Sequence, residues 1–381
     1  MTRPLTRIHS ATPVGEPAFA FLETDGPRIA GPEARALPQG TSETLSERLA
    51  EALKTLPRDG LIGGALPFDR SALDIFWASD TSATSRRPGG LMPVALGLSA
   101  EPAASAYAAA VERALERMAL STRLEKVVLA RSLALDCATE IDRAALLEAL
   151  SGDPSATAFD VRLPGDTPRH LIGATPELLL RKSGAEISSH PLAGSARRSR
   201  DPVADRAAAD SLSGSPKDRR EHAFVVEAIL DTLAPLCRTL SAPEGTTVTS
   251  TGSMWHLGTK IIGKLSDPET PAPVLAALLH PTPAVCGTPR PEAAQLIADL
   301  EPRDRGYYAG AVGWCDAQGD GAWYVAIRCA EVCGTQARLF AGAGIVPGSD
   351  PAAEAAETGS KFAAMLEAFG LPRDAALTLT E

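Results

Sequence analysis

Long apolar runs and surplus positive charge are both missing from this sequence of 381 residues. No stretch approaches the roughly 18 apolar residues of a membrane span, and segment 1–21 lacks the apolar block of a secretory signal. Lys and Arg number 37 against 47 Asp and Glu, so nothing supports a basic surface for nucleic acid or an anionic membrane. We therefore expect a cytoplasmic protein without nucleic-acid or membrane partners.

Several signatures of catalysis and metal binding are also missing. The six cysteines form no CxxC pair, which disfavours a zinc site or a disulfide framework. The chain has no HExxH and no GxSxG motif, so zinc proteolysis and serine hydrolysis lack support. The GAGIVPG turn at 342–348 is a poor dinucleotide fingerprint, because Pro347 stands at the third glycine position.

The apolar composition of 44% is enough to fill a sizeable core, and no repeat of fixed period is present. Segment 1–100 is rich in Ala, Pro and Gly with weak periodicity, and 82–93 is expected to be an exposed loop. We expect a single domain over 1–381, in which 1–100 is the less informative part.

From residue 101 the pattern becomes regular. Helical spacing over 101–120 precedes a β-branched run, so Lys126 is expected to begin a strand. Hairpin-like pairs dominate over β-α-β units, which favours an α/β fold of the α+β type, with large antiparallel or mixed sheets covered by helices. Further strands are predicted at 158–163, 170–172, 177–181, 186–190, 247–251, 256–265, 308–316, 322–330 and 337–341, and helices at 202–212, 218–236, 273–279, 291–300 and 351–369.

Two carboxylate pairs share an i, i+3 spacing on predicted helices, which places each pair on one helix face. They are Asp218 with Glu221, and Glu354 with Glu357. Mg²⁺ takes oxygen ligands and needs only one or two carboxylates beside water and substrate, so each pair could be half of one metal site. Spacing alone also fits solvated acids that complement the helix dipole, and without other evidence this reading is favoured.

Arg328 stands in the apolar run WYVAIRCAEV, which is predicted to be a strand. A charged residue in a buried strand needs a partner, and both a structural salt bridge and a substrate carboxylate fit. His256 and His190 stand in motif-like surroundings, but a lone histidine is more often structural.

Nine segments in order resemble the chorismate-utilising enzymes, namely the isochorismate, salicylate, anthranilate and aminodeoxychorismate synthases. The resemblance runs from 124 to 371 and implies a single large α/β domain with two stacked antiparallel sheets flanked by helices. The segments are EKVVLAR, GATPELLLR, HPLAGSARR, SPKDRREHAFVVEAI, STGSMWHLGTKI, LHPTPAVCGTPR, DRGYYAGAVGW, YVAIRCAEV and AGAGIVPGSDPAAEAAETGSK.

The resemblance implies a site for Mg²⁺ and chorismate. Glu221 and Glu357 would hold the metal, with Asp218 and Glu354 as outer or alternate ligands. The ring carboxylate of chorismate would meet Mg²⁺, and its enolpyruvyl carboxylate would meet Arg328. The implied substrate-binding residues are Gly194, His256, Ala284, Tyr308, Ile327, Arg328, Gly342, Ala343, Gly344 and Lys361.

The resemblance also bears on the nucleophile that attacks the ring. Water-using members have a lysine base at the place of Lys126, whereas ammonia users typically have glutamine there. Aminodeoxychorismate synthases use a lysine where this chain has Ala193. Water attack at C2 by way of Lys126, with Glu177 protonating the C4 hydroxyl, is therefore implied. A monomer with no glutaminase subunit is expected.

Both roles require abnormal pKa values, because the lysine must be neutral and the glutamic acid protonated near pH 7. Burial shifts the pKa of both groups in these directions.

The water-using activities are isochorismate and salicylate formation, and the second adds elimination of pyruvate. Ala284 stands where salicylate-forming relatives often have threonine, whereas Tyr308 replaces a phenylalanine common in isochorismate synthases. We expect an isochorismate synthase serving catechol siderophore (2,3-dihydroxybenzoate) or menaquinone synthesis, with salicylate synthase as the alternative. A non-catalytic chorismate-binding relative is disfavoured, because the lysine and all four acids are present.

Overall fold

Three antiparallel sheets form the framework of the computed structural model, which describes residues 16–23, 28–82, 90, 92–121, 123–165 and 167–379. Most of the predicted loop at 82–93 lies outside these residues. Within them the strand pairs are antiparallel, several of them between consecutive strands, and two sheets are large, which confirms the predicted fold class.

In the described part of the chain, the first sheet has nine strands. Its order is β17 (Gly287–Thr288), β7 (Lys126–Cys137), β21 (Gln336–Ile345), β20 (Cys329–Cys333), β9 (Arg169–Thr175), β8 (Thr157–Leu163), β1 (Phe19–Leu22) and β2 (Arg28–Gly31), with β6 (Ala95–Glu101) also paired to β7.

The second large sheet also has nine strands, and a third has three. The second has the order β13 (Cys237–Ser241), β16 (Ile261–Leu265), β11 (Glu186–His190), β10 (Leu178–Ser183), β19 (Gly321–Val325), β18 (Ala311–Asp316), β4 (Leu61–Leu66), β5 (Ile75–Ser79) and β3 (Arg35–Ala36). The third has the order β12 (Leu192–Arg197), β15 (Met254–Thr259) and β14 (Thr246–Ser250). Segment 1–100 thus supplies strands to both large sheets.

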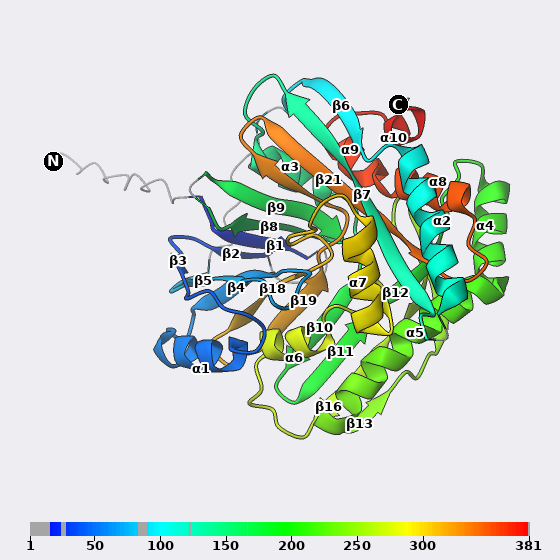
Figure 1. Cartoon of the computed structure of the whole chain (residues 1–381). Helices are drawn as coiled ribbons and strands as arrows, with labels where there is room; N and C mark the ends of the chain where they lie inside the picture. Colours follow the sequence, from blue (N-terminus) through cyan, green and yellow to red (C-terminus); the bar gives the residue numbers. More distant parts are fainter. Residues whose placement is uncertain are drawn as a thin grey trace.

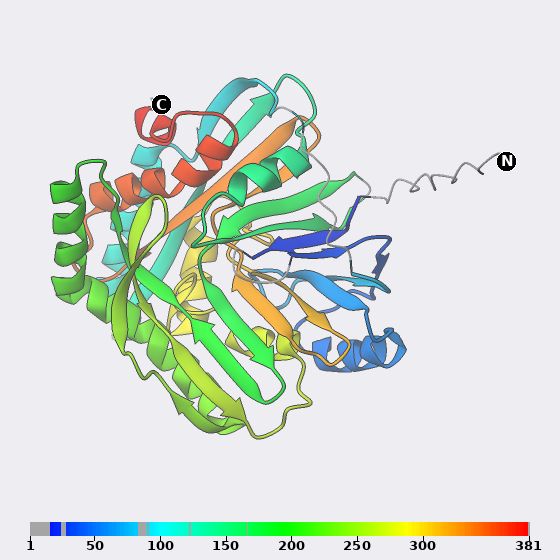
Figure 2. The same ribbon diagram turned by 180° about the vertical axis from the view of Figure 1, so that it is seen from behind.

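The two large sheets stack face to face, as Figures 1 and 2 show from opposite sides. The fully buried ring of Phe19, from the first sheet, lies against Gly63 of the second, where a Cβ would come within 2.3 Å of the ring. Glycine at this position therefore lets the aromatic ring fill the space between the sheets. Trp323 and Phe76 continue this core, with ring centroids 5.7 Å apart.

Helices cover the outer faces of the sheets (Figures 1 and 2). α2 and α7 pack on β7, α3 on β8 and β9, and α8 on β21, whereas α6 packs on β10 and β18 and α5 on β12. The helices are α1 (Leu45–Thr55), α2 (Ala104–Leu120), α3 (Arg143–Leu150), α4 (Pro202–Gly214), α5 (Pro216–Leu233), α6 (Ala272–Leu279), α7 (Arg290–Leu300), α8 (Pro351–Lys361), α9 (Ala363–Ala368) and α10 (Ala375–Thr378).

Three segments that were each predicted to be one element are two separate elements in the structure. The strand expected at 256–265 is β15 and β16, which belong to different sheets and separate at Lys260. The strand expected at 322–330 is β19 and β20, again in different sheets, so Arg328 lies between strands with φ of 51°. The helix expected at 351–369 is α8 and α9, which separate at the fully buried Phe362. Tertiary packing overrides local periodicity at each break.

Tyr308 and Glu177 also lie outside the strands predicted to contain them. Tyr308 is in the turn before β18, and Glu177 immediately precedes β10. Both positions are at strand ends, where side chains can face a cavity rather than a sheet.

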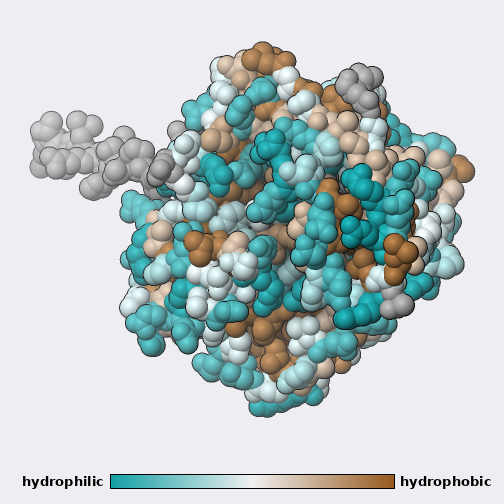
Figure 3. Space-filling model, in the orientation of Figure 1, coloured by the Kyte–Doolittle hydropathy of each residue, from teal (hydrophilic) through white to brown (hydrophobic). Residues whose placement is uncertain are grey.

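Polar and apolar residues alternate over the face shown in Figure 3, where brown patches are small and separated. Among the described residues, no helix combines the length and apolarity that crossing a membrane requires.

Candidate active site

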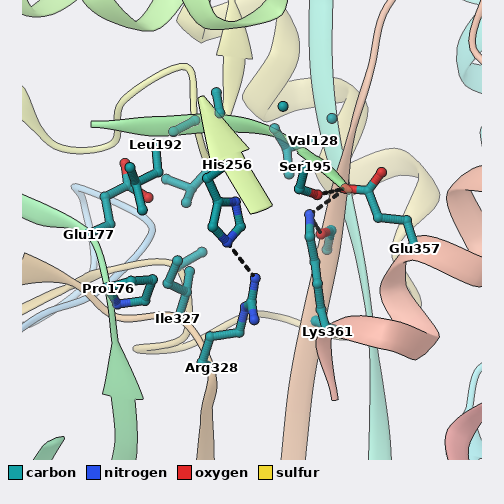
Figure 4. Close-up of a pocket in the computed structure, with 18 of the residues that line it drawn as sticks. Val128, Pro176, Glu177, Leu192, Ser195, His256, Ile327, Arg328, Glu357 and Lys361 are labelled. Atoms are coloured by element: carbon teal, nitrogen blue, oxygen red, sulfur yellow. Dashed lines mark hydrogen bonds and ion pairs between the residues drawn. The ribbon is translucent and has the colours of Figure 1, made fainter. Parts of the chain in front are cut away.

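One cavity gathers residues from most of the predicted motifs. It encloses about 700 Å³ including its open mouth, a size suited to a small ligand. Figure 4 shows His256 and Arg328 between Glu177 on one side and Lys361 with Glu357 on the other. Of the predicted residues, the lining includes Glu177, Gly194, Glu221, His256, Ala284, Tyr308, Ile327, Arg328, Gly342, Gly344, Glu357 and Lys361.

The two acid pairs owe their positions to well-defined helix starts. Ser215 caps α5 by accepting a hydrogen bond from the Asp218 N–H, and Asp350 caps α8 in the same way. Proline follows each cap at the first helical position, where its missing N–H costs no hydrogen bond. Each helix therefore begins at a defined residue, and Glu221 and Glu357, three residues beyond the first acid, reach the cavity.

Lys126 is the first residue of β7 and is fully buried. Its Nζ lies 3.1 Å from Glu221 Oε1, an ion-pair distance, but no acceptor among the described residues is aligned for a hydrogen bond. A Cβ on the lining residue Gly344 would come within 3.1 Å of Lys126 Cε and 2.1 Å of Glu221 Oε1. Glycine at position 344 therefore leaves the space in which Lys126, behind the lining, meets the lining residue Glu221.

Glu177 is a buried carboxyl group across the cavity from Glu357 and Lys361 (Figure 4). Burial is the largest influence and raises the pKa of Glu177 from 4.5 to about 8. A hydrogen bond from the Leu192 N–H and the charge of Lys126 lower the pKa, but less strongly. Glu177 is therefore protonated at neutral pH and can donate a proton into the cavity.

Glu357 is a carboxylate held by two donors. Its Oε1 accepts a hydrogen bond from Ser195 Oγ at 2.8 Å and lies 2.6 Å from Lys361 Nζ. Although burial acts to raise the pKa of Glu357, the Lys361 charge and these hydrogen bonds outweigh it and lower the pKa. Lys361 Nζ also donates to the Gly342 carbonyl at 2.9 Å, so the ammonium group is fixed beside the cavity.

Asp218 and Glu354 lie behind the cavity lining. Lys217 Nζ donates to Glu354 Oε1 at 2.6 Å, and Asp218 lies against Gly194. Burial raises the pKa of both acids, and the neighbouring acids Glu221 and Glu357 raise it further for Asp218 and Glu354 respectively. The acids are close enough to disfavour one another's charge.

This concentration of carboxylates fits a hard divalent cation. Among the described residues no three His, Cys, Asp or Glu side chains converge into a ready metal cluster. Mg²⁺ does not require one, because it usually keeps water and takes one or two carboxylates with substrate oxygens. Glu221 and Glu357 both line the cavity and could supply these carboxylates, while Asp218 and Glu354 stand behind them.

Arg328 is a buried cation without a carboxylate partner at ion-pair distance in the described part of the chain. Its closest polar contact is Nη2 to His256 Nε2 at 3.5 Å. Burial, and then the Arg328 charge, keep the pKa of His256 well below its usual value, so the imidazole is neutral. A neutral histidine cannot compensate the guanidinium, which leaves Arg328 available to an anionic ligand.

Aromatic and small residues complete the cavity. Tyr308 stacks on Phe340 with ring centroids 4.8 Å apart. Strand alternation in β21 brings Gly342 and Gly344 to the lining, whereas the fully buried Ala343 between them does not line it.

Sequence reasoning missed Ser195, Leu192 and Lys217. The PLAGS motif contained a signal for the first two, because a serine and a backbone N–H beside buried acids can donate to them.

Comparison with known proteins assigns the family. Residues 78–370 match the family model described as chorismate binding enzyme. Isochorismate synthase DhbC of Bacillus subtilis is 43% identical over 87% of each chain. The crystal structure of DhbC from Bacillus anthracis, a candidate 2,3-dihydroxybenzoate-specific isochorismate synthase, is 39% identical with a TM-score of 0.87, covering 93% of this chain and 97% of that one.

A more distant solved relative has the same fold. MenF, the menaquinone-specific isochorismate synthase of Escherichia coli, is 27% identical with a TM-score of 0.77, covering 93% of this chain and 88% of that one. The sequence match spans most of the chain, and the neighbours share its stacked sheets. The chain therefore belongs to the chorismate binding enzyme family.

Proposed function

We propose that this protein is a Mg²⁺-dependent isochorismate synthase, which adds water at C2 of chorismate as the C4 hydroxyl departs. The observation that carries the proposal is a fully buried lysine beside the lining residue Glu221, together with a protonated glutamic acid in the lining of the same cavity. The names of the relatives support it. Of the two solved relatives, DhbC is described as specific for 2,3-dihydroxybenzoate and MenF as specific for menaquinone.

Cationic residues account for binding of the dianion. In the proposed complex, Arg328 forms an ion pair with the enolpyruvyl carboxylate, beside Tyr308, and Lys361 adds positive charge next to the cavity. Glu221 and Glu357 would hold Mg²⁺, which when bound supplies positive charge for the ring carboxylate. Ser195 donates a hydrogen bond to Glu357 and so orients this carboxylate.

Lys126 and Glu177 carry out the proton transfers. Lys126, in its neutral form, takes a proton from water as the water oxygen bonds to C2. The ring double bonds shift, the C4–O bond breaks, and Glu177 gives its proton to the departing hydroxyl, which leaves as water. One water enters and one leaves, so substrate and product are isomers.

Product analysis tests the assignment. The protein is incubated with chorismate and Mg²⁺, and the products are separated by chromatography. Isochorismate as the main product is expected. Salicylate with pyruvate would transfer the assignment to salicylate synthase, which Tyr308 favours and Ala284 disfavours. An absence of turnover would exclude both enzymes and leave a chorismate-binding protein.

Removal of the metal is expected to stop the reaction. With excess EDTA, turnover should fall to background because the paired carboxylates would then face the substrate's carboxylate uncompensated. Added Mg²⁺ should restore the rate. Full activity after exhaustive chelation would contradict the metal assignment while leaving the Lys126 and Glu177 roles intact.

The Gly344→Ala variant tests whether turnover depends on the position of Glu221, which lies beside Lys126. The new Cβ would meet Glu221 Oε1 at 2.1 Å, so the flexible carboxylate must move while the backbone can stay. We expect turnover to fall by at least about tenfold through misplacement of Glu221. The thermal midpoint should shift by no more than about 3 °C.

Gly97→Ala is the matched control, because Gly97 also lies in a strand and a Cβ there meets nothing within 4 Å. Its turnover should equal that of the parent. Equal turnover in both variants would mean that the position of Glu221 does not matter.

A further inference from the structure

The ion pair of Glu301 and Arg305 lies behind the cavity and contacts three of its walls. Both side chains are almost fully buried, with 8% and 3% exposed. Arg305 binds the carboxylate in bidentate fashion, with Nε to Oε2 at 2.9 Å and Nη2 to Oε1 at 2.5 Å. The pair follows α7 and precedes the turn that contains Tyr308.

The pair fills a gap along the edge of β7. β17 pairs with β7 only at Lys126 and Val127, and β6 pairs with it only from Ser132 onward. Between these, the Ala130 N–H donates to Glu301 Oε1 at 2.8 Å, and Arg305 Nη2 donates to the Val128 carbonyl at 2.7 Å. Two side chains thus replace the missing strand over the stretch that follows Lys126.

The same guanidinium fixes two further walls. Arg305 Nη1 donates to the Val285 carbonyl at 2.7 Å, next to the lining residue Ala284. Its plane lies over Phe68, with Cζ 4.4 Å from the ring centroid, and 6.0 Å from the centroid of Tyr308. Val128, Val285 and Tyr308 all line the cavity.

We infer that Glu301 and Arg305 are positioning residues that set the separation between the Lys126 strand and the opposing walls formed by Ala284, Val285 and Tyr308. An apolar pair of similar volume could fill this space, but it could not satisfy the Ala130 N–H and Val128 carbonyl. The fork geometry of arginine is required, because it reaches Glu301, Val128 and Val285 together, whereas lysine has a single nitrogen.

The inference rests on the proposed function, and Arg305→Lys tests it. The variant keeps the charge but cannot hold all three partners, so the Lys126 strand loses its fixed distance to the other walls. We expect kcat for chorismate to fall by about 100-fold. KM should stay within about threefold, because Arg328 and Lys361 are untouched.

A second, partly buried ion pair provides the control. Arg48 binds Asp74 in bidentate fashion at 2.5 and 2.9 Å and donates to the carbonyls of Pro38 and Thr41, and neither side chain lines the cavity. Arg48→Lys should lower the thermal midpoint about as much as Arg305→Lys but leave kcat within about twofold. A general loss of stability would lower the activity of both variants alike.

Glu301→Gln supplies a second test, since it preserves shape and the acceptor for the Ala130 N–H while losing charge. It should lower kcat in the same way, and combining it with Arg305→Lys should lower kcat little further, because the two residues act as one unit. Unchanged kcat in folded Arg305→Lys or Glu301→Gln would overturn the inference. So would failure of both to fold while Arg48→Lys folds, since the pair would then serve the fold alone. Absence of turnover in the parent would instead refute the proposed function.

Discussion

The Lys126→Ala variant is expected to lose chorismate turnover by about three orders of magnitude, because the base that takes the proton from water is gone. Substrate binding should remain measurable, since Arg328 and Lys361 still offer positive charge to the dianion. Turnover is measured by product chromatography, and binding by calorimetry at an enzyme concentration where the variant consumes no substrate. A near-normal rate would refute the assignment of Lys126 as the base.

Lys182 offers a matched control for this substitution. It is a buried lysine in β10 whose Nζ lies 2.5 Å from Asp320 Oδ1, an acid that does not line the cavity, whereas Glu221 beside Lys126 does. Lys182→Ala removes the same side chain and also leaves an acid without its partner, so it reproduces the structural cost of Lys126→Ala. In the Lys182 variant, turnover should fall only as far as the fraction of folded protein falls. In the Lys126 variant, turnover should fall much further than that fraction.

The Glu177→Gln variant should reduce kcat by about 10² to 10⁴, because the amide cannot protonate the departing hydroxyl. In the parent, kcat/KM should decline as pH rises through about 8, where Glu177 loses its proton. The measurement is a pH profile of kcat/KM for both proteins, with Glu23→Gln as control, since Glu23 is a buried glutamate that binds Arg181 and Tyr324. An alkaline limb that persists unchanged in Glu177→Gln would assign that limb to another group.

The same carboxyl group has a predictable effect on stability. Its pKa is higher in the folded protein, about 8, than the ordinary 4.5, so between these values the folded state holds a proton that the unfolded chain has released. The contribution of Glu177 to stability is therefore undiminished below pH 4.5 and falls as pH rises toward 8. Relative to the parent, Glu177→Gln should gain thermal stability between pH 5 and pH 8.

Local sequence patterns predicted elements well where packing follows the chain's own periodicity. The strand that begins at Lys126 appears as expected, the helix predicted at 218–236 corresponds to α5, and α8 begins at the predicted residue 351. The pattern failed at Lys260 and Arg328, where the chain crosses from one sheet to another within what was predicted to be one strand. A left-handed arginine has no local signal, because its conformation is imposed by the strands on either side.

The site was predictable to the extent that chemistry demands residue types at fixed spacing. The i, i+3 acids showed which helices could face a cation, and the family resemblance supplied the partners of these acids. Neither could show that Glu354 is paired with Lys217 or that Glu301 and Arg305 brace β7. Such contacts join positions far apart in sequence, and single residues of these types are common on any surface.

The pairing of β7 with β21 has a consequence for biosynthesis. Residues that face each other in this pair, such as Gln336 and Asp136, are 200 positions apart. While the chain emerges from the ribosome, one edge of β7 therefore keeps its backbone N–H and C=O groups unpaired until β21 has been made. An open edge of this kind invites intermolecular association. We expect the nascent chain to need a holding chaperone during this interval, although Lys126, the proposed catalytic base, has been synthesised long before.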